Sequence, residues 1–210
     1  MTQVLKTVKV VEDESLRSVR ALESALESMG QDIQGLYRED EVKVTSSPED
    51  LMKVMRSVAD ATSSAVSASH SRNQEDIENV ANIGRKVVTE LLTTVKGLEF
   101  PSEELKEEVY KLGHTLASQY YDLLSNILVG VHNDTEELKD DILDISRSIA
   151  HSTAEMTKLA EKVAGEDLVD PEDPMVIAER ELFNAAESIE LAAKRLAALR
   201  PRQEVVVAAG

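Results

Sequence analysis

The sequence contains no cysteine and no tryptophan, and aromatic residues make up only 3% of its 210 residues. Without cysteine the chain has no disulfides and no thiolate metal ligands, which fits a reducing compartment. The few aromatic side chains supply no stacking platform for single-stranded nucleic acid. We therefore expect a core of aliphatic side chains and no nucleic-acid partner.

Long apolar runs and an excess of positive charge are also lacking. No stretch of 18 consecutive apolar residues occurs, and the N-terminus lacks the charged-then-apolar pattern of a signal peptide. We therefore expect no transmembrane segment, no secretion and a cytoplasmic location. The 23 basic and 40 acidic residues give a net charge of −17, which disfavours attraction to nucleic acid and to anionic lipid.

Proline is scarce, and its distribution predicts long helices. The five prolines, at positions 48, 101, 171, 174 and 201, lie at the ends of segments with helical periodicity. In the first segment, apolar residues from Val4 to Leu36 recur in alternating steps of three and four. Over more than 30 residues, this pattern predicts about 50 Å of helix.

Four further helices are predicted to follow the first. Their start signals are Ser47 before Pro48, Asn73 with Asp76, Ser102 with Glu103 and Glu104, and Asp134 with Glu137. Gly165 is suited to end the last of them. Because the connections are short, consecutive helices should pack antiparallel. The sequence therefore predicts an all-α fold with an up-and-down five-helix bundle over residues 3–168.

A sixth helix is predicted over residues 170–200. Asp170 before Pro171 and Asp173 before Pro174 are alternative starts, and Pro201 is predicted to end the helix. Its apolar stripe consists of Ile177, Leu182, Ala185, Ala186, Ile189, Ala192, Ala193, Leu196 and Leu199. The first five helices do not need this stripe, so we expect one additional long helix that opens a further domain.

No residue pattern predicts catalysis or a metal centre. The four histidines lack the spacing of a zinc-binding helix, and no nucleophile elbow or glycine-rich phosphate loop occurs. Acidic clusters at residues 12–14, 39–41, 136–137 and 140–141 fit solvated helix faces and helix starts better than metal ligands. We therefore expect no enzymatic activity, no metal and no cofactor.

Several segments resemble the C-terminal rod region of the talin family. VDPEDPMVIAE (169–179) and LRPR (199–202) are similar to the first helix of the I/LWEQ actin-binding module, which endocytic adaptors share. LKTVK (5–9), VEDE (11–14), RALE (20–23), QED (74–76) and AN (81–82) resemble the preceding rod bundle. The resemblance divides the chain into a rod-like bundle (3–168), the upstream helix of an incomplete I/LWEQ-type module (169–202) and a tail (203–210).

The resemblance implies a force-bearing scaffold segment at adhesions between cell and matrix. Talins join integrin tails to actin, bear tension through serial helical bundles and expose vinculin-binding helices when bundles open. The implied partners are actin, vinculin and, in the closed state, the talin head. The helix at 170–200 is implied to restrain the actin-binding helices. The helices that carry actin binding and dimerisation are expected to be absent.

Two groups in the sixth helix are candidate partner-binding residues. Leu182, Ala185, Ala186 and Ile189 match the opening of the talin vinculin-binding pattern, although any helix with a close-packed small face shows the same spacing. Lys194, Arg195, Arg200 and Arg202 form the densest basic group, which could contact a filament or lipid. The alternative is that these cations complement the negative end of the helix.

A second function class is an amphipathic helical bundle that binds membrane surfaces or lipid. Long aliphatic helices without tryptophan permit it. The net charge of −17 and the few cations beside the apolar stripes argue against it.

Overall fold

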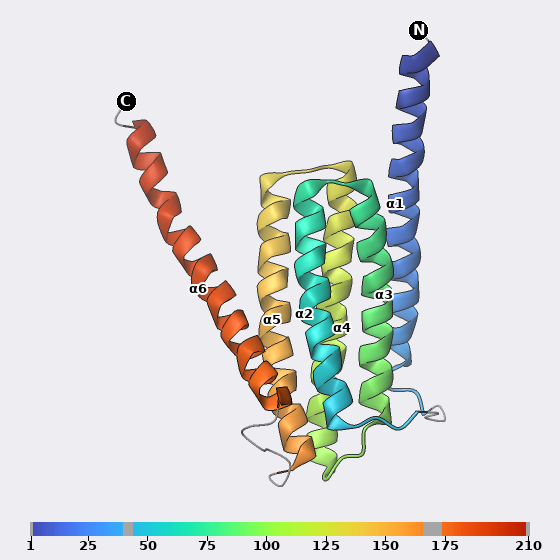
Figure 1. The fold of residues 1–210 in the computed structure, drawn as a ribbon, viewed down its shortest axis with the longest axis vertical. Helices are drawn as coiled ribbons and strands as arrows, with labels where there is room; N and C mark the ends of the chain where they lie inside the picture. The colour runs from blue at the N-terminus through green and yellow to red at the C-terminus, as the bar shows by residue number, and fades with distance from the viewer. Residues whose placement is uncertain (1, 40–43, 166–173, 209–210) are drawn as a thin grey trace. The chain divides into compact units, whose positions relative to one another are not determined.

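The computed structural model describes residues 2–39, 44–165 and 174–208, and these fold into six helices. The helices are α1 (Thr2–Gly35), α2 (Pro48–Ser71), α3 (Gln74–Gly97), α4 (Glu103–His132), α5 (Glu136–Ala164) and α6 (Pro174–Ala208) (Figure 1). Within the described residues the only β pairing is an isolated bridge between Ser46 and Leu98. The predicted all-α class is confirmed. No helix in the described part of the chain is long and apolar enough to cross a bilayer.

The helix starts follow local capping chemistry. Ser47 and Asp50 form a capping box, in which the Ser47 amide donates to Asp50 Oδ2 at 3.0 Å and the Asp50 amide donates to Ser47 Oγ at 3.2 Å. The hydrogen bond from the Ser47 backbone lowers the pKa of Asp50. The predicted start of α5 at Asp134 is wrong by one residue, because Thr135 is the N-cap and accepts from the Leu138 amide. Asp134 instead forms ion pairs with Arg72 and Lys139.

The five helices of residues 1–167 alternate in direction, but their order around the bundle is not the order of the chain (Figure 1). α1 packs mainly against α3 and α4, while α2 packs against α3 and α5, and α4 packs against α5. The expectation that α1 and α2 are antiparallel neighbours is therefore wrong. The chain after α1 passes the C-terminal end of α3, where the Ser46 amide donates to the Gly97 carbonyl at 2.9 Å. α1 and α3 consequently lie side by side and parallel.

The bundle core is almost entirely aliphatic, as the composition predicts. The face of α2 that packs on α3 and α5 is small, with Ala61, Ala65 and Ala68 buried beside larger residues. Tyr120 is the one aromatic residue among the fully buried large side chains, and its Oη has no hydrogen-bond partner in the described part of the chain. Burial raises the pKa of the Tyr120 phenol far above its usual range. The phenol is therefore neutral at every physiological pH.

Two glycines permit close approaches within the bundle. A Cβ at Gly84 would lie 2.7 Å from Tyr120 Cε1 and 2.9 Å from Leu124 Cδ1. A Cβ at Gly97 would lie 2.5 Å from Ser46 Oγ, beside the bridge that guides the chain into α2. Neither contact is tolerated by ordinary van der Waals packing, so α3 needs both glycines to fit its neighbours.

The first turns of α1 extend beyond the packed part of the bundle (Figure 1). Ser18 donates to Gln74, the first residue of α3, and residues before Ser18 continue past this level. Val4, predicted to belong to the inner stripe, is exposed. Of the later residues of this stripe, Leu22, Leu26, Met29 and Leu36 are buried, and Val19 and Ile33 are half-buried.

The second compact unit of the chain contains α6. α6 continues through Pro201 to Ala208, so the prediction that Pro201 ends the helix is wrong. Proline removes one backbone hydrogen bond, but the strong helix formers around it, such as Leu199, Arg200 and Gln203, favour continuation. Residues 203–208, predicted to be a tail, therefore belong to α6. The alternative start at Asp170 lies outside the described residues.

Candidate partner-binding surfaces

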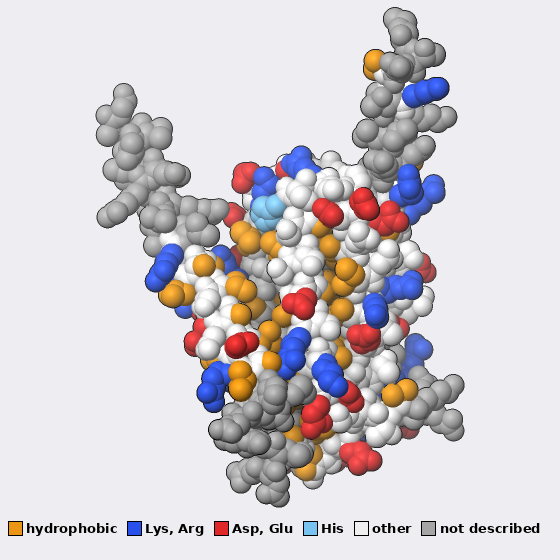
Figure 2. All heavy atoms as spheres, viewed as in Figure 1, with side chains coloured by type: hydrophobic (Ala, Val, Ile, Leu, Met, Phe, Trp, Pro, Cys, Tyr) orange, Lys and Arg blue, Asp and Glu red, His pale blue; other side chains and the backbone are white. Residues whose placement is uncertain are grey.

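The described side chains of α6 leave large apolar residues open to solvent. Ile177, Phe183, Ile189 and Leu191 are 49%, 41%, 56% and 51% exposed. Of the four candidate vinculin-binding residues, Leu182 and Ala186 are half-buried, while Ala185 and Ile189 are exposed. Figure 2 shows hydrophobic side chains mixed with charged ones along this helix. These apolar side chains lie on several faces of α6, where a partner could cover them.

The first two residues of the basic group, Lys194 and Arg195, lie well before the end of α6. Lys194 is exposed and pairs with Glu190 at 2.7 Å, four residues earlier, and Arg195 is also exposed. Arg200 and Arg202 fall in the helix, but their side chains lie outside the described set. Because α6 runs to Ala208, Lys194 is about 20 Å from its last residue. The helix-end explanation is therefore wrong for Lys194 and Arg195, since that interaction falls off within one turn.

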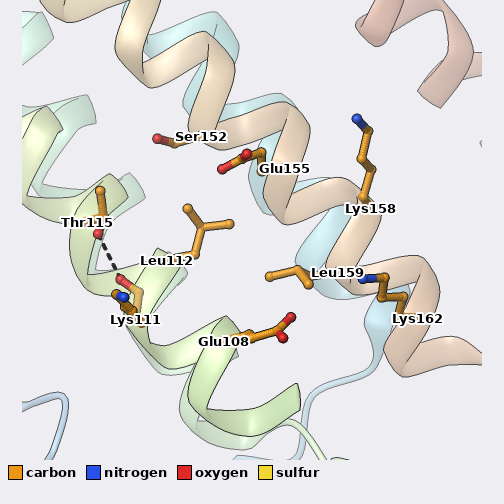
Figure 3. Close-up of a pocket in the computed structure, with 9 residues that line it drawn as sticks. All are labelled: Glu108, Lys111, Leu112, Thr115, Ser152, Glu155, Lys158, Leu159 and Lys162. Atoms are coloured by element: carbon orange, nitrogen blue, oxygen red, sulfur yellow. Dashed lines mark hydrogen bonds between the residues drawn. The ribbon is translucent and has the colours of Figure 1, made fainter. Parts of the chain in front are cut away.

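A groove of about 530 Å³ lies between α4 and α5 (Figure 3). It is lined by Glu108, Lys111, Leu112, Thr115, Ser152, Glu155, Lys158, Leu159 and Lys162. The half-buried Leu112 and Leu159 form an apolar floor, and charged side chains stand along both walls. Two parallel ridges with an apolar floor are suited to receive an elongated segment of another chain.

An aromatic cluster gathers where α1, α3 and α4 end or begin. Tyr37 lies 6.1 Å from Tyr110 and 5.9 Å from His114, and Phe100 lies 6.1 Å from Tyr110, measured between ring centroids. Tyr37 is 61% exposed, whereas the other rings are half-buried. Burial raises the pKa of the Tyr110 phenol. These contacts attach the segment after α1 to α4.

The remaining polar candidates stay on the surface. His70, His132 and His151 are exposed, His151 Nε2 lies 3.3 Å from Glu155 Oε1, and His114 is half-buried beside Tyr37. In the described part of the chain, no three acidic or histidine side chains converge as metal ligands. Of the acidic clusters, residues 12–14 have undescribed side chains and residues 40–41 lie outside the described ranges. Glu136 and Glu137 occupy the first turn of α5.

The groove and the aromatic cluster were not predicted from the sequence. Leu112 and Leu159 follow helical periodicity, but nothing in that periodicity shows that they face one groove. Tyr37 and Tyr110 come together only because α1 packs against α4, and the predicted helix order did not place these two helices together.

Comparison with known proteins gives one consistent result. No protein-family model matches the chain. Over 205 residues, 96% of its length, the chain is 40% identical to Talin-2 from Homo sapiens and 41% identical to Talin-2 from Mus musculus. It is 37% identical to Talin-1 from Gallus gallus over 205 residues. The chain spans only 8% to 9% of the length of these relatives.

Proposed function

Because this chain is a homologue of one segment of the talins, 37% to 41% identical over 96% of its own length, we propose that it is a non-enzymatic cytoskeletal scaffold segment acting at cell adhesions. The similarity across nearly the whole chain is the observation that carries the proposal. The shared segment is a small part of each relative. Actin, vinculin and the talin head are therefore proposed partners of the assembly to which the segment contributes.

The proposed mechanical role is to bear load between integrin adhesions and actin. Five helices share one aliphatic core, so stretching the chain must separate helices that stabilise one another. α2 presents alanines to that core, and alanine buries less apolar area than leucine at about 25 cal/mol per Å². α2 is therefore proposed to detach first under load, and its loss is proposed to open the shared core in the same cooperative step. This behaviour would give the segment a regulatory response to force.

Single-molecule stretching of the full chain tests the mechanical proposal. Residues 1–167 should extend in one cooperative step of roughly 500 Å, given about 3.3–3.6 Å per extended residue less the folded length. Filling the small face of α2 with Ala61→Leu and Ala65→Leu should change the unfolding force in either direction, since added methylenes fill space or overpack. An unchanged force would remove α2 from the account, and gradual extension would exclude a cooperative bundle.

α6 is proposed to be the first, upstream helix of an I/LWEQ-type module. Its exposed Ile177, Phe183, Ile189 and Leu191 support a role against partner helices. In this role α6 would restrain actin-binding helices.

Leu182, Ala185, Ala186 and Ile189 are proposed as a vinculin-binding face by the helix-in-groove mode. A vinculin-head pull-down should retain the full chain, and Leu182→Asp should abolish retention because a carboxylate replaces the apolar anchor. Glu181→Asp, at the adjacent exposed acidic position, is the matched control. Absence of retention by the unmodified chain would end this proposal.

Lys194, Arg195, Arg200 and Arg202 are proposed as a filament contact. F-actin co-sedimentation near physiological salt should pellet the full chain, and reversing these four charges to glutamate should release it. If the full chain stays in the supernatant, the basic group is not an actin site.

The membrane-surface bundle is the less supported function. The net charge of −17 opposes binding to anionic lipid. Flotation with anionic and neutral liposomes separates the two functions. The scaffold proposal predicts that the chain stays with the soluble fraction in both cases.

A further inference from the structure

The groove between α4 and α5 has the dimensions of a short helix. From Glu108 to Thr115, the α4 wall spans about 10 Å, or two helical turns at 1.5 Å per residue. Leu112 and Leu159 extend toward one another across the floor, and Ser152 and Thr115 lie at one end (Figure 3). A partner helix with apolar residues three and four positions apart would place two side chains on this floor.

The charge of the groove is opposite in sign to that of the chain. Three lysines and two glutamates line it, whereas the whole chain carries −17. One of the glutamates, Glu155, already lies 3.3 Å from His151. Among the described residues, Lys111 and Lys162 form no ion pair. Acidic side chains of a ligand would therefore find two cations that form no ion pair within the described residues, although Glu108 lines the same groove.

We propose that the α4–α5 groove binds a short amphipathic helix of a partner protein, with apolar residues on Leu112 and Leu159 and acidic residues facing Lys111 and Lys162. A helix suits the site because both walls are helices, so the groove offers side-chain ridges and no strand edge for an extended peptide. The inference rests on the groove itself and does not depend on the proposed adhesion function.

The probe is a capped 18-residue peptide with leucine at positions 4, 8, 11 and 15 and glutamate beside each leucine. The control peptide keeps the leucines and carries lysine at every glutamate position. Titration into the ¹⁵N-labelled full chain should shift amide signals of residues 108–115 and 152–162, and the acidic peptide should bind more tightly. Shifts centred elsewhere, or tighter binding of the lysine peptide, would overturn the proposal.

Charge reversal then tests the assigned contacts. Lys111→Glu with Lys162→Glu should weaken the acidic peptide about fivefold or more, because two weak surface attractions become repulsions, and should strengthen the lysine peptide. Lys86→Glu, on the exposed surface of α3, is the matched control and should leave both affinities unchanged. Leu159→Ala should weaken both peptides while the far-UV spectrum stays helical. Equal affinities across all variants would show that the groove is not the binding site.

Discussion

Gly84 and Gly30 offer a direct test of how tightly α3 and α4 approach. Both glycines lie inside helices, so replacing either by alanine should gain about 1 kcal/mol of helix propensity. Their surroundings differ. The nearest atom to a Cβ at Gly30 would be Tyr121 Cε2 at 3.8 Å, an ordinary contact, whereas at Gly84 it would be Tyr120 Cε1 at 2.7 Å.

The Gly84 contact cannot relax at small cost. Carbon atoms pack best about 3.5–4.0 Å apart, so the Tyr120 ring would have to move by about 1 Å. Tyr120 is 1% exposed and Leu124 is 0% exposed, so neither side chain has free space beside it. Overpacking of this kind costs about 1–3 kcal/mol. Gly30→Ala should therefore stabilise the bundle by about 1 kcal/mol, and Gly84→Ala should be about 1–3 kcal/mol less stable than Gly30→Ala.

Urea unfolding followed by tyrosine fluorescence measures this difference. The chain has no tryptophan, and all four tyrosines lie in residues 1–167, so the signal reports on the bundle and not on α6. The slope of the unfolding free energy against urea should be the same for both variants, since the exposed surface is unchanged. Equal stabilities of Gly84→Ala and Gly30→Ala would refute the close approach of α3 and α4.

Three other substitutions test the core and the caps. Tyr120→Phe should stabilise the bundle by about 1 kcal/mol because it removes a buried hydroxyl without a partner in the described part of the chain. Because the folded pKa of Tyr120 is raised, wild-type stability should also fall as pH rises from about 10, the pKa of the unfolded phenol. Urea unfolding of Tyr120→Phe should show a smaller decline, of which the part due to Tyr110 remains. Thr135→Ala should lower the stability by about 1 kcal/mol because it removes the N-cap of α5, while Thr135→Ser keeps the hydroxyl and should leave the stability unchanged. Thermal unfolding measures both variants, and equal losses of stability would disprove the cap. The folded pKa of Asp50 is lowered, so its carboxylate stabilises the fold above the unfolded pKa of 3.8, and this stabilisation is lost as pH falls through the folded pKa. Asp50→Asn should therefore make the free energy of unfolding depend less on pH in the acid range. An unchanged pH dependence would contradict the capping box.

The sequence predicted features that depend on neighbouring residues better than those that depend on packing. Ser47 and Ser102 cap α2 and α4 as expected, because capping involves residues three positions apart. The error of one residue at α5 arose because Asp134 and Thr135 are both good caps, and the pairing of Asp134 with Arg72 is a tertiary contact. Local signals therefore located the helices to within a residue or so at these starts.

The order of the helices and the candidate surfaces depend on contacts between distant residues. The segment from 36 to 47 is long enough to let α3 lie beside α1, and periodicity contains no information about that choice. The same long-range packing brings Leu112 to Leu159 and Tyr37 to Tyr110. In α6, the prediction that Pro201 ends the helix was wrong. The alternative in which Lys194 and Arg195 complement the helix end therefore fails, because the helix continues to Ala208.

Replacement within a talin tests the proposed scaffold function most directly. Talin-deficient cells would receive an intact talin, a talin lacking the homologous segment, or a talin in which this chain replaces that segment. The account predicts that the replaced talin localises to adhesions and restores traction force to the level of the intact talin, above the level reached without the segment. Normal expression and localisation with traction no higher than that of the deletion would contradict the claim that this chain is a load-bearing segment of the talin type.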